Sequence, residues 1–232
     1  MLRLFSRLSF TFTILIFISA CSTHQTVVEY EGSGIAAPEA GPTINSIVVS
    51  DDRGTESNWL GAIRGGYGNV LKTLQTEQST DIIVDQMYTA ALGQSGIYST
   101  DIDGPYSLKV SISKFDCSYY FNREAHAHVR ISLIENESRN AVFEKSYKTD
   151  ETESGVGAGV FGDVDTLRDL AELAMNKTID KMLSDDEFIL AATKQSETAV
   201  GIRIKKLESL YREDLITEKE YLDKREKILS EI

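Results

Sequence analysis

Two histidines, His126 and His128, have the spacing that could best support metal binding or acid–base chemistry. Residues two apart in a strand point to the same face of a sheet, so the two imidazoles would lie side by side. A zinc site needs at least a third protein ligand, and the next side chain on that face is Arg130. We therefore predict a solvated face with no metal and no other cofactor. A hydrolase that used one of these histidines as its base is the third of three functional hypotheses.

The remaining chemistry-bearing residues are acidic pairs and glycine-rich runs. Asp51-Asp52 and Asp185-Asp186 are adjacent in sequence, an arrangement typical of acidic surface. The runs LGAIRGGYG and GVGAGVFGD lack the lysine and hydroxyl residue of a phosphate-binding loop. The sequence thus predicts no catalytic residues and a protein that is not an enzyme.

The first residues have the layout of a signal peptide. Arg3 and Arg7 lie in a basic leader, an apolar run covers residues 8–20, and polar sequence follows at Cys21. As a helix this run would span roughly 20 Å, which is short of the roughly 30 Å hydrocarbon core of a bilayer. We therefore predict a signal peptide over residues 1–20.

The four residues Ile18-Ser19-Ala20-Cys21 resemble the bacterial lipobox. The resemblance implies that the Cys21 thiol receives diacylglycerol and that the mature chain begins at Cys21, usually with a further N-acyl chain. Two or three acyl chains hold a protein on a membrane permanently, since each buried methylene contributes about 0.8 kcal/mol. Ser22, in place of an aspartate, favours the periplasmic leaflet of the outer membrane. The alternatives are a short uncleaved anchor or an unmodified cysteine.

Charge and cysteine content limit the partners. The chain has 24 Lys and Arg against 36 Asp and Glu, a net charge of −12. Such a surface is repelled by phosphate backbones, so we predict no nucleic acid partner and a membrane attachment made by the lipid. With Cys21 acylated, no disulfide can form within the chain. Cys117 is then either a buried core residue or an exposed thiol that pairs between chains.

Residues 21–43 are rich in Gly, Pro, Ser and Thr and lack a sustained period. We predict a flexible tether that lets the folded part stand off the membrane. Residues 44–195 follow with a strand at 44–50 and an exposed, turn-rich loop over 51–69.

Period-two alternation predicts three further strands near residues 106–113, 125–133 and 142–147. Two amphipathic helices, capped by Thr80 and Asp165, have apolar stripes. The stripes are Ile83, Val84, Met87, Tyr88 and Ala91, and Leu167, Leu170, Ala171, Ala174, Thr178 and Met182. The predicted fold is α+β, a two-layer domain in which two helices cover a mainly antiparallel sheet.

The predicted loop contains the residues most typical of a recognition surface, because Trp and Arg are common interface anchors. They are Asp51, Arg53, Trp59 and Arg64. The alternative is an internal ion pair that closes the loop.

Several stretches of the domain resemble the YajG family of bacterial lipoproteins. They are the lipobox, the strand entering Asp51-x-Arg53, the run ALGQSGIYSTDIDGPYSLKVSISKF, the following strands with VFEKSYKT, and SDDEFI. The resemblance covers about residues 44–195 and implies an α+β periplasmic domain without a settled activity. GVGAGVFGD and the sequence after Gln195 depart from the family.

Residues 200–232 predict an αα hairpin. Leu207 and Tyr211 continue a helical stripe, Thr217 and Glu220 form a capping box, and Ile216 and Tyr221 lie where a hydrophobic staple packs. The turn resembles that of a SHOCT domain, with Asp214 in place of the usual glycine. Some 30 residues bury little apolar surface alone, so the hairpin must dock on its own domain, on another copy or on a partner helix.

These features lead to two further hypotheses. In the first, a lipid-anchored envelope protein without enzymatic activity acts by binding envelope proteins or copies of itself. In the second, it is an accessory subunit that binds a lipid or peptidoglycan fragment for a transport system. The second requires a pocket beneath the sheet.

Overall fold

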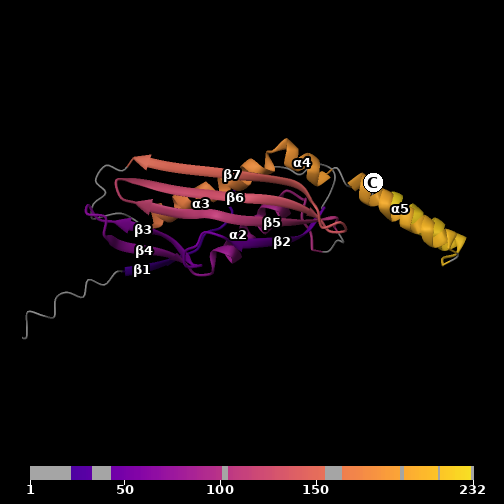
Figure 1. The fold of residues 1–232 in the computed structure, drawn as a ribbon, viewed down its shortest axis with the longest axis horizontal. Coiled ribbons are helices and arrows are strands. Elements are labelled where there is room, and N and C mark those ends of the chain that lie inside the picture. Colours follow the sequence, from indigo (N-terminus) through magenta and orange to yellow (C-terminus); the bar gives the residue numbers. More distant parts are fainter. Residues whose placement is uncertain are drawn as a thin grey trace, which may run out of the picture.

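The computed structural model describes residues 22–32, 43–100, 104–154, 164–193, 196–213 and 215–230. It consists of a sheet covered by helices and a C-terminal pair of helices (Figure 1). The predicted α+β class with an antiparallel core is therefore confirmed.

Seven strands form one sheet in the order β1-β4-β3-β5-β6-β7, with β2 also paired to β5. Their bounds are β1 Ser22–Thr26, β2 Ile44–Asp51, β3 Trp59–Arg64, β4 Val70–Thr76, β5 Tyr106–Tyr119, β6 Asn122–Glu135 and β7 Ala141–Ser154. The three longest strands, β5 to β7, form an antiparallel meander. β2 runs parallel to the first half of β5, and β3 runs parallel to its last residues.

Helices α2 (Thr80–Gln94) and α3 (Val164–Leu183) cover one face of the sheet (Figure 1), and α4 (Asp186–Thr193) follows α3. Every residue of the two predicted apolar stripes is buried. So are the inward residues of β5 and β6, and these sets join in one core. A bulge between Ile112 and Lys114 shifts the alternation in β5, so that Phe115, Cys117 and Tyr119 also point inward.

The two residues predicted to cap helices lie within the first turn of those helices. Thr80 is the first residue of α2, after Ser79, and Asp165 is the second residue of α3. The Thr80 side chain is fully buried and its hydroxyl accepts a hydrogen bond from Arg53. It therefore joins α2 to the sheet edge instead of capping the helix.

The exposed loop predicted over residues 51–69 is wrong for residues 59–64, whereas residues 65–69 form a turn as predicted. Trp59–Arg64 forms β3, which lies between β4 and β5 and buries Leu60, Ala62 and Ile63. Gly61 is a site of close strand approach, because a Cβ there would lie 2.2 Å from the Cys117 carbonyl oxygen. The glycine in WLGAIR thus permits strand packing where we expected a turn.

The predicted flexible tether is also wrong for residues 22–32. β1 pairs in parallel with β4, and Val28 is buried in the core. The Tyr30 hydroxyl donates a 2.8 Å hydrogen bond to Asp180 of α3. Residues 33–42 lie outside the described part. The ordered sheet therefore begins at the residue that directly follows Cys21.

Cys117 is fully buried between β3 and β6, with its Sγ 3.6 Å from the Leu60 carbonyl oxygen. Burial raises the pKa of this thiol, which keeps it protonated. We expect a chromogenic disulfide reagent to react with it at least roughly a hundredfold more slowly in the native chain than in urea. Native reaction at the rate of an exposed thiol would contradict the buried position.

Helices α5 (Ser196–Arg212) and α6 (Glu218–Leu229) form the predicted hairpin. They pack mainly against each other and extend beyond one end of the sheet (Figure 1). Within the described residues, no helix is both long and apolar enough to cross a bilayer.

Candidate interaction surface

The turn between α5 and α6 contains the predicted capping box. The Thr217 hydroxyl accepts from the Glu220 backbone N–H at 3.3 Å, and the Glu220 carboxylate accepts from the Thr217 N–H at 2.9 Å. Hydrogen bonds from the backbone and hydroxyl of Thr217 hold the pKa of Glu220 below its usual range. The start of α6 is therefore fixed by local side chains, as the Thr-x-x-Glu spacing predicts.

The two helices meet along a short apolar seam. Leu207 of α5 and Ile228 of α6 are buried, with 5% and 8% exposed. Tyr211 and Tyr221 stack with ring centroids 4.9 Å apart. Ile216 is half-buried in the turn. The predicted packing residues thus lie at or beside the contact between the helices. Ile228 of α6 also belongs to this contact.

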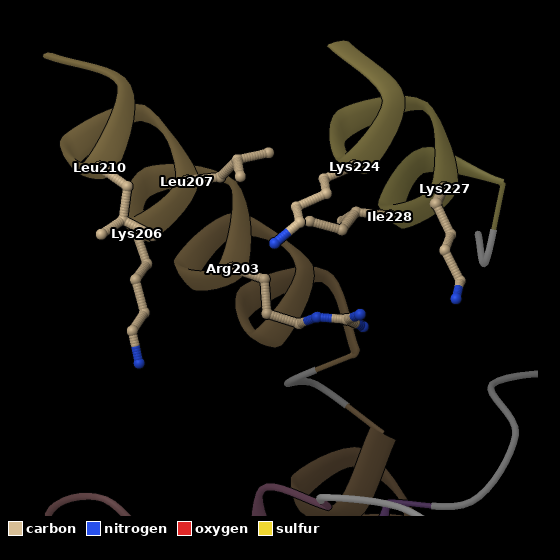
Figure 2. Close-up of a pocket in the computed structure, with 7 residues that line it drawn as sticks. All are labelled: Arg203, Lys206, Leu207, Leu210, Lys224, Lys227 and Ile228. Carbon is tan, nitrogen blue, oxygen red and sulfur yellow. The ribbon is translucent and has the colours of Figure 1, made fainter. Parts of the chain in front are cut away.

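A groove of about 300 Å³ opens along this seam (Figure 2). Leu207 and Ile228 extend into the space between the helices, and four cationic residues contribute to its lining. The lining residues are Arg203, Lys206, Leu207, Leu210, Lys224, Lys227 and Ile228. An apolar floor bordered by ammonium and guanidinium groups fits an apolar side chain with carboxylates beside it. We call this the hairpin groove.

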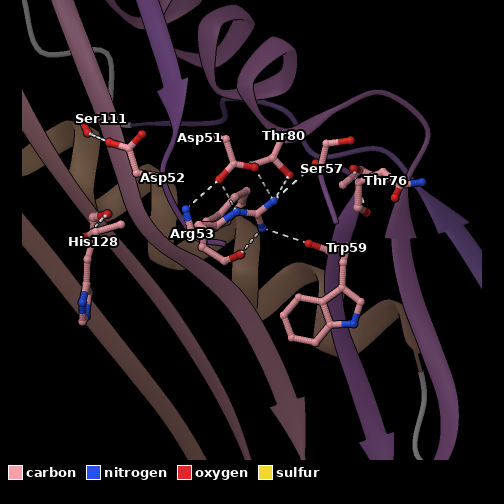
Figure 3. A network of polar contacts seen from close by, with 12 residues as sticks. Asp51, Asp52, Arg53, Ser57, Trp59, Thr76, Thr80, Ser111 and His128 are labelled. Carbon is pink, nitrogen blue, oxygen red and sulfur yellow. Dashed lines mark hydrogen bonds and ion pairs between the residues drawn. The ribbon is translucent and has the colours of Figure 1, made fainter. Parts of the chain in front are cut away.

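The residues predicted as a recognition patch have a different arrangement. The Arg53 side chain is 4% exposed and forms a bidentate ion pair with Asp51, both N–O distances being 2.8 Å (Figure 3). The same guanidinium donates to the carbonyl oxygens of Trp59 and Phe115 at 2.9 and 2.8 Å, and to the Thr80 hydroxyl at 2.8 Å. The internal ion pair, the alternative reading of these residues, is thus present.

Arg53 occupies the place where β5 changes its neighbour. β2 pairs with β5 up to Ile112, and β3 pairs with it from Cys117 onward. The Phe115 carbonyl lies between these ladders and takes its hydrogen bond from Arg53. Burial raises the pKa of Asp51, but the hydrogen bonds and charge of Arg53 outweigh it and leave the pKa lowered.

Trp59 and Arg64 stand at opposite ends of β3, so they lie roughly 16 Å apart along the strand. Trp59 is half-buried, and its carbonyl belongs to the Arg53 network. Arg64 is exposed and donates to the Gly68 carbonyl at 3.2 Å. The four predicted residues therefore do not converge on one surface.

His126 and His128 lie on the open face of the sheet, opposite the helices. His126 Nδ1 is 2.7 Å from Asp116, and His128 Nε2 is 2.8 Å from Asp150. The hydrogen bond from His128 lowers the pKa of Asp150. The described residues hold no group of three His, Cys, Asp or Glu side chains placed to bind a metal. The two aspartates come from neighbouring strands, and only the register of β5, β6 and β7 could have revealed them.

Comparison with known proteins finds relatives of the sheet domain. A family model described as an uncharacterized lipoprotein matches residues 35–191, so the match ends before α5. Protein XCC0632 from Xanthomonas campestris has a similar structure, with 13% identity and a TM-score of 0.52. The alignment covers 77% of this chain and 99% of that chain. None of the curated proteins matches the chain significantly.

Two further solved structures match with lower TM-scores. A PelC dodecamer from Paraburkholderia phytofirmans is 12% identical with a TM-score of 0.37, covering 69% of this chain and 94% of that one. Lipoprotein GNA1162 from Neisseria meningitidis is 10% identical with a TM-score of 0.22, covering 58% and 98%. Cys21, the predicted lipidation site, lies outside the described residues.

Proposed function

The chain belongs to this family of uncharacterized lipoproteins, and on that premise we propose that it is a lipid-anchored envelope protein that works by binding other proteins. Its anchor is the acylated Cys21, and its binding site is the hairpin groove. Membership of a lipoprotein family implies attachment to the envelope. The lipobox, the YajG resemblance and Ser22 support the finer placement in the periplasmic leaflet of the outer membrane.

The observation that carries this proposal is the independence of the hairpin. α5 and α6 contact each other and have no comparable contact with the sheet domain among the described residues. Leu215 and Leu222 are 64% and 53% exposed on the hairpin. Exposed apolar side chains on a small module mark it as a site of interaction. Of the partners predicted for the hairpin, its own domain is thus the least supported.

Charge selects the kind of partner. Arg203, Lys206, Lys224 and Lys227 border the groove in a chain whose net charge is −12. They favour a protein segment that presents an apolar side chain between carboxylates, such as an acidic amphipathic helix. The SHOCT-like turn and the family's lipid anchor are consistent with such a docking role. A second copy of this acidic chain would be one source of that segment.

The alternative, an accessory subunit that binds a lipid or peptidoglycan fragment, needs a pocket beneath the sheet. There the described residues are closely packed, with Tyr88, Phe115 and Phe188 fully buried. No observation favours this alternative over protein binding.

The hairpin groove can be tested by reversing its charges. In the variant Lys206→Glu/Lys227→Glu, capture of partners from detergent-solubilised membranes should fall roughly tenfold, since charge complementarity is reversed. Removing residues 200–232 should abolish capture. The oligomeric state is measured on the same samples by light scattering.

The matched control is Lys205→Glu/Lys219→Glu, which makes the same charge change at exposed positions outside the groove. It should capture as the parent chain does. Unchanged partners and unchanged oligomeric state after removal of residues 200–232 would exclude the hairpin as the binding site.

A further inference from the structure

Three aromatic side chains are exposed at one end of the sheet. Tyr67 in the β3–β4 turn is fully exposed, Phe121 in the β5–β6 turn is 69% exposed, and Tyr120 beside it is 36% exposed. We call Tyr67, Tyr120 and Phe121 the aromatic tip. Neither turn, residues 65–69 or 120–121, contains an acidic residue in this acidic chain. The two turns of the tip therefore contain no carboxylate, in a molecule otherwise rich in carboxylates, and the exposed Arg64 donates to the Gly68 carbonyl beside them.

The two turns lie side by side. β3 and β5 are parallel neighbours, with Ile63 level with Tyr119, so both turns begin at the same height of the sheet. The Tyr120 hydroxyl donates to the Gly66 carbonyl at 3.1 Å, which joins the turns directly. The rings of Tyr120 and Phe121 contact each other, with centroids 4.1 Å apart. The tip is thus a single surface.

The first described residues lie at this same end. β1 runs parallel to β4 with Ser22 level with Lys72, and β4 leaves the β3–β4 turn at Val70. Two residues correspond to roughly 7 Å along a strand. Cys21 directly precedes Ser22, and one residue spans at most about 3.6 Å. Acyl chains on Cys21 would therefore enter a bilayer close to the aromatic tip.

We propose that the aromatic tip lies in the interfacial layer of the bilayer that holds acylated Cys21. This inference rests on the proposed lipid anchor. Aromatic side chains favour the membrane–water interface, where a ring is partly buried and a Tyr hydroxyl stays hydrated. Because no spacer separates the anchor from the tip, the tip stays at the membrane surface. Its insertion is then an intramolecular step that needs no separate binding event.

The orientation follows from the strand lengths. β5, β6 and β7 each have 14 residues, so they reach roughly 40 Å from the tip. At their far end, Phe188 of α4 packs on Phe143 near the start of β7, with ring centroids 5.6 Å apart. α5 and α6 continue from there, at the opposite end from the tip (Figure 1). The hairpin groove is thereby held away from the membrane that anchors the chain.

Tryptophan reporters in the full-length lipidated chain test this orientation. Trp59 is the only native tryptophan and is replaced by Phe in all samples. Single reporters are then placed by Phe121→Trp at the tip, Val48→Trp on the open sheet face and Leu222→Trp on α6. All three native residues are exposed, so the reporters disturb no core. Each protein is reconstituted into phosphatidylcholine vesicles, with or without brominated acyl chains.

We expect brominated lipid to remove most of the emission at position 121, with a blue shift, and to leave positions 48 and 222 unquenched. Absence of quenching at 121 in a chain that sediments with the vesicles would overturn the aromatic tip as a membrane contact. Equal quenching at all three positions would overturn it too, because the domain would then lie flat. Mass spectrometry of the same samples determines independently whether Cys21 is acylated. A chain without acyl mass on Cys21 would overturn the proposed function and this inference with it.

Discussion

Replacing Arg53 by methionine is expected to lower the free energy of unfolding by about 3–5 kcal/mol, which is the usual cost of leaving a buried charge without its partner. The substitution removes the guanidinium that pairs with Asp51, whose side chain is 14% exposed. It also leaves the carbonyl oxygens of Trp59 and Phe115 without their donor. Urea denaturation followed by far-UV circular dichroism measures the change.

Lysine at position 53 should rescue little of this loss. A single ammonium cannot make a bidentate carboxylate pair and also reach two carbonyls and the Thr80 hydroxyl. The planar fork of arginine supplies donors in several directions from one fixed position. Arg53→Lys should therefore resemble Arg53→Met more than the parent chain.

Arg64→Met is the matched control, since Arg64 is exposed at the end of β3 and donates to the Gly68 carbonyl at 3.2 Å. Its expected effect is within about 0.5 kcal/mol. The double variant Arg53→Met/Asp51→Leu should recover part of the loss, because the uncompensated carboxylate is gone. Equal stabilities for the Arg53 and Arg64 variants would contradict a structural role for the buried pair.

The elements predicted correctly from the sequence are those whose signal is local. The alternation in β5 and β6 and the stripes of α2 and α3 repeat over enough residues to identify both the element and its buried face. The capping box of Thr217 and Glu220 is local as well, since both bonds form within one turn of α6. Such features require no knowledge of the rest of the fold.

The elements that were missed depend on distant partners. STHQT contains no apolar residue and thus no apolar alternation, and it becomes β1 because β4 offers it an edge. The glycine of β3 is explained only by the approach of Cys117, 56 residues later in the chain. In the Asp-x-Arg motif, the spacing indicates an ion pair. Arg53 also donates a hydrogen bond to the Phe115 carbonyl, which is 62 residues away in the sequence and could not be predicted from that spacing. Spacing alone therefore left the recognition patch and the ion pair as alternatives.

Because residues 22–26 form strand β1, the predicted lipid anchor restricts how the domain is oriented on the membrane. A flexible tether would let the domain turn freely above the membrane, whereas a strand that starts at Ser22 couples the domain directly to Cys21. In the proposed orientation the two ends of the sheet have different surroundings, lipid at the aromatic tip and solvent at the hairpin groove.

Removing Cys21 should have the largest effect on location. A chain exported with an ordinary cleavable leader and starting at Ser22 should leave the membrane fraction, with its membrane-to-soluble ratio reduced at least roughly a thousandfold. The reason is that two or three acyl chains make attachment essentially permanent, whereas the few exposed rings of the aromatic tip give only weak, reversible contact. Cell fractionation by ultracentrifugation, with the parent chain alongside, measures the ratio.

Cys117→Ala serves as the control, because it removes the other cysteine of the chain from a buried position and should leave the membrane fraction unchanged. If the chain starting at Ser22 still sediments with membranes after a high-salt wash, attachment depends on the folded domain or its partners. The acyl anchor would then be dispensable, and the coupling of β1 to the bilayer would lose its basis. If the chain becomes soluble but keeps its hairpin partners, anchoring and binding are separate properties of the two ends of the molecule.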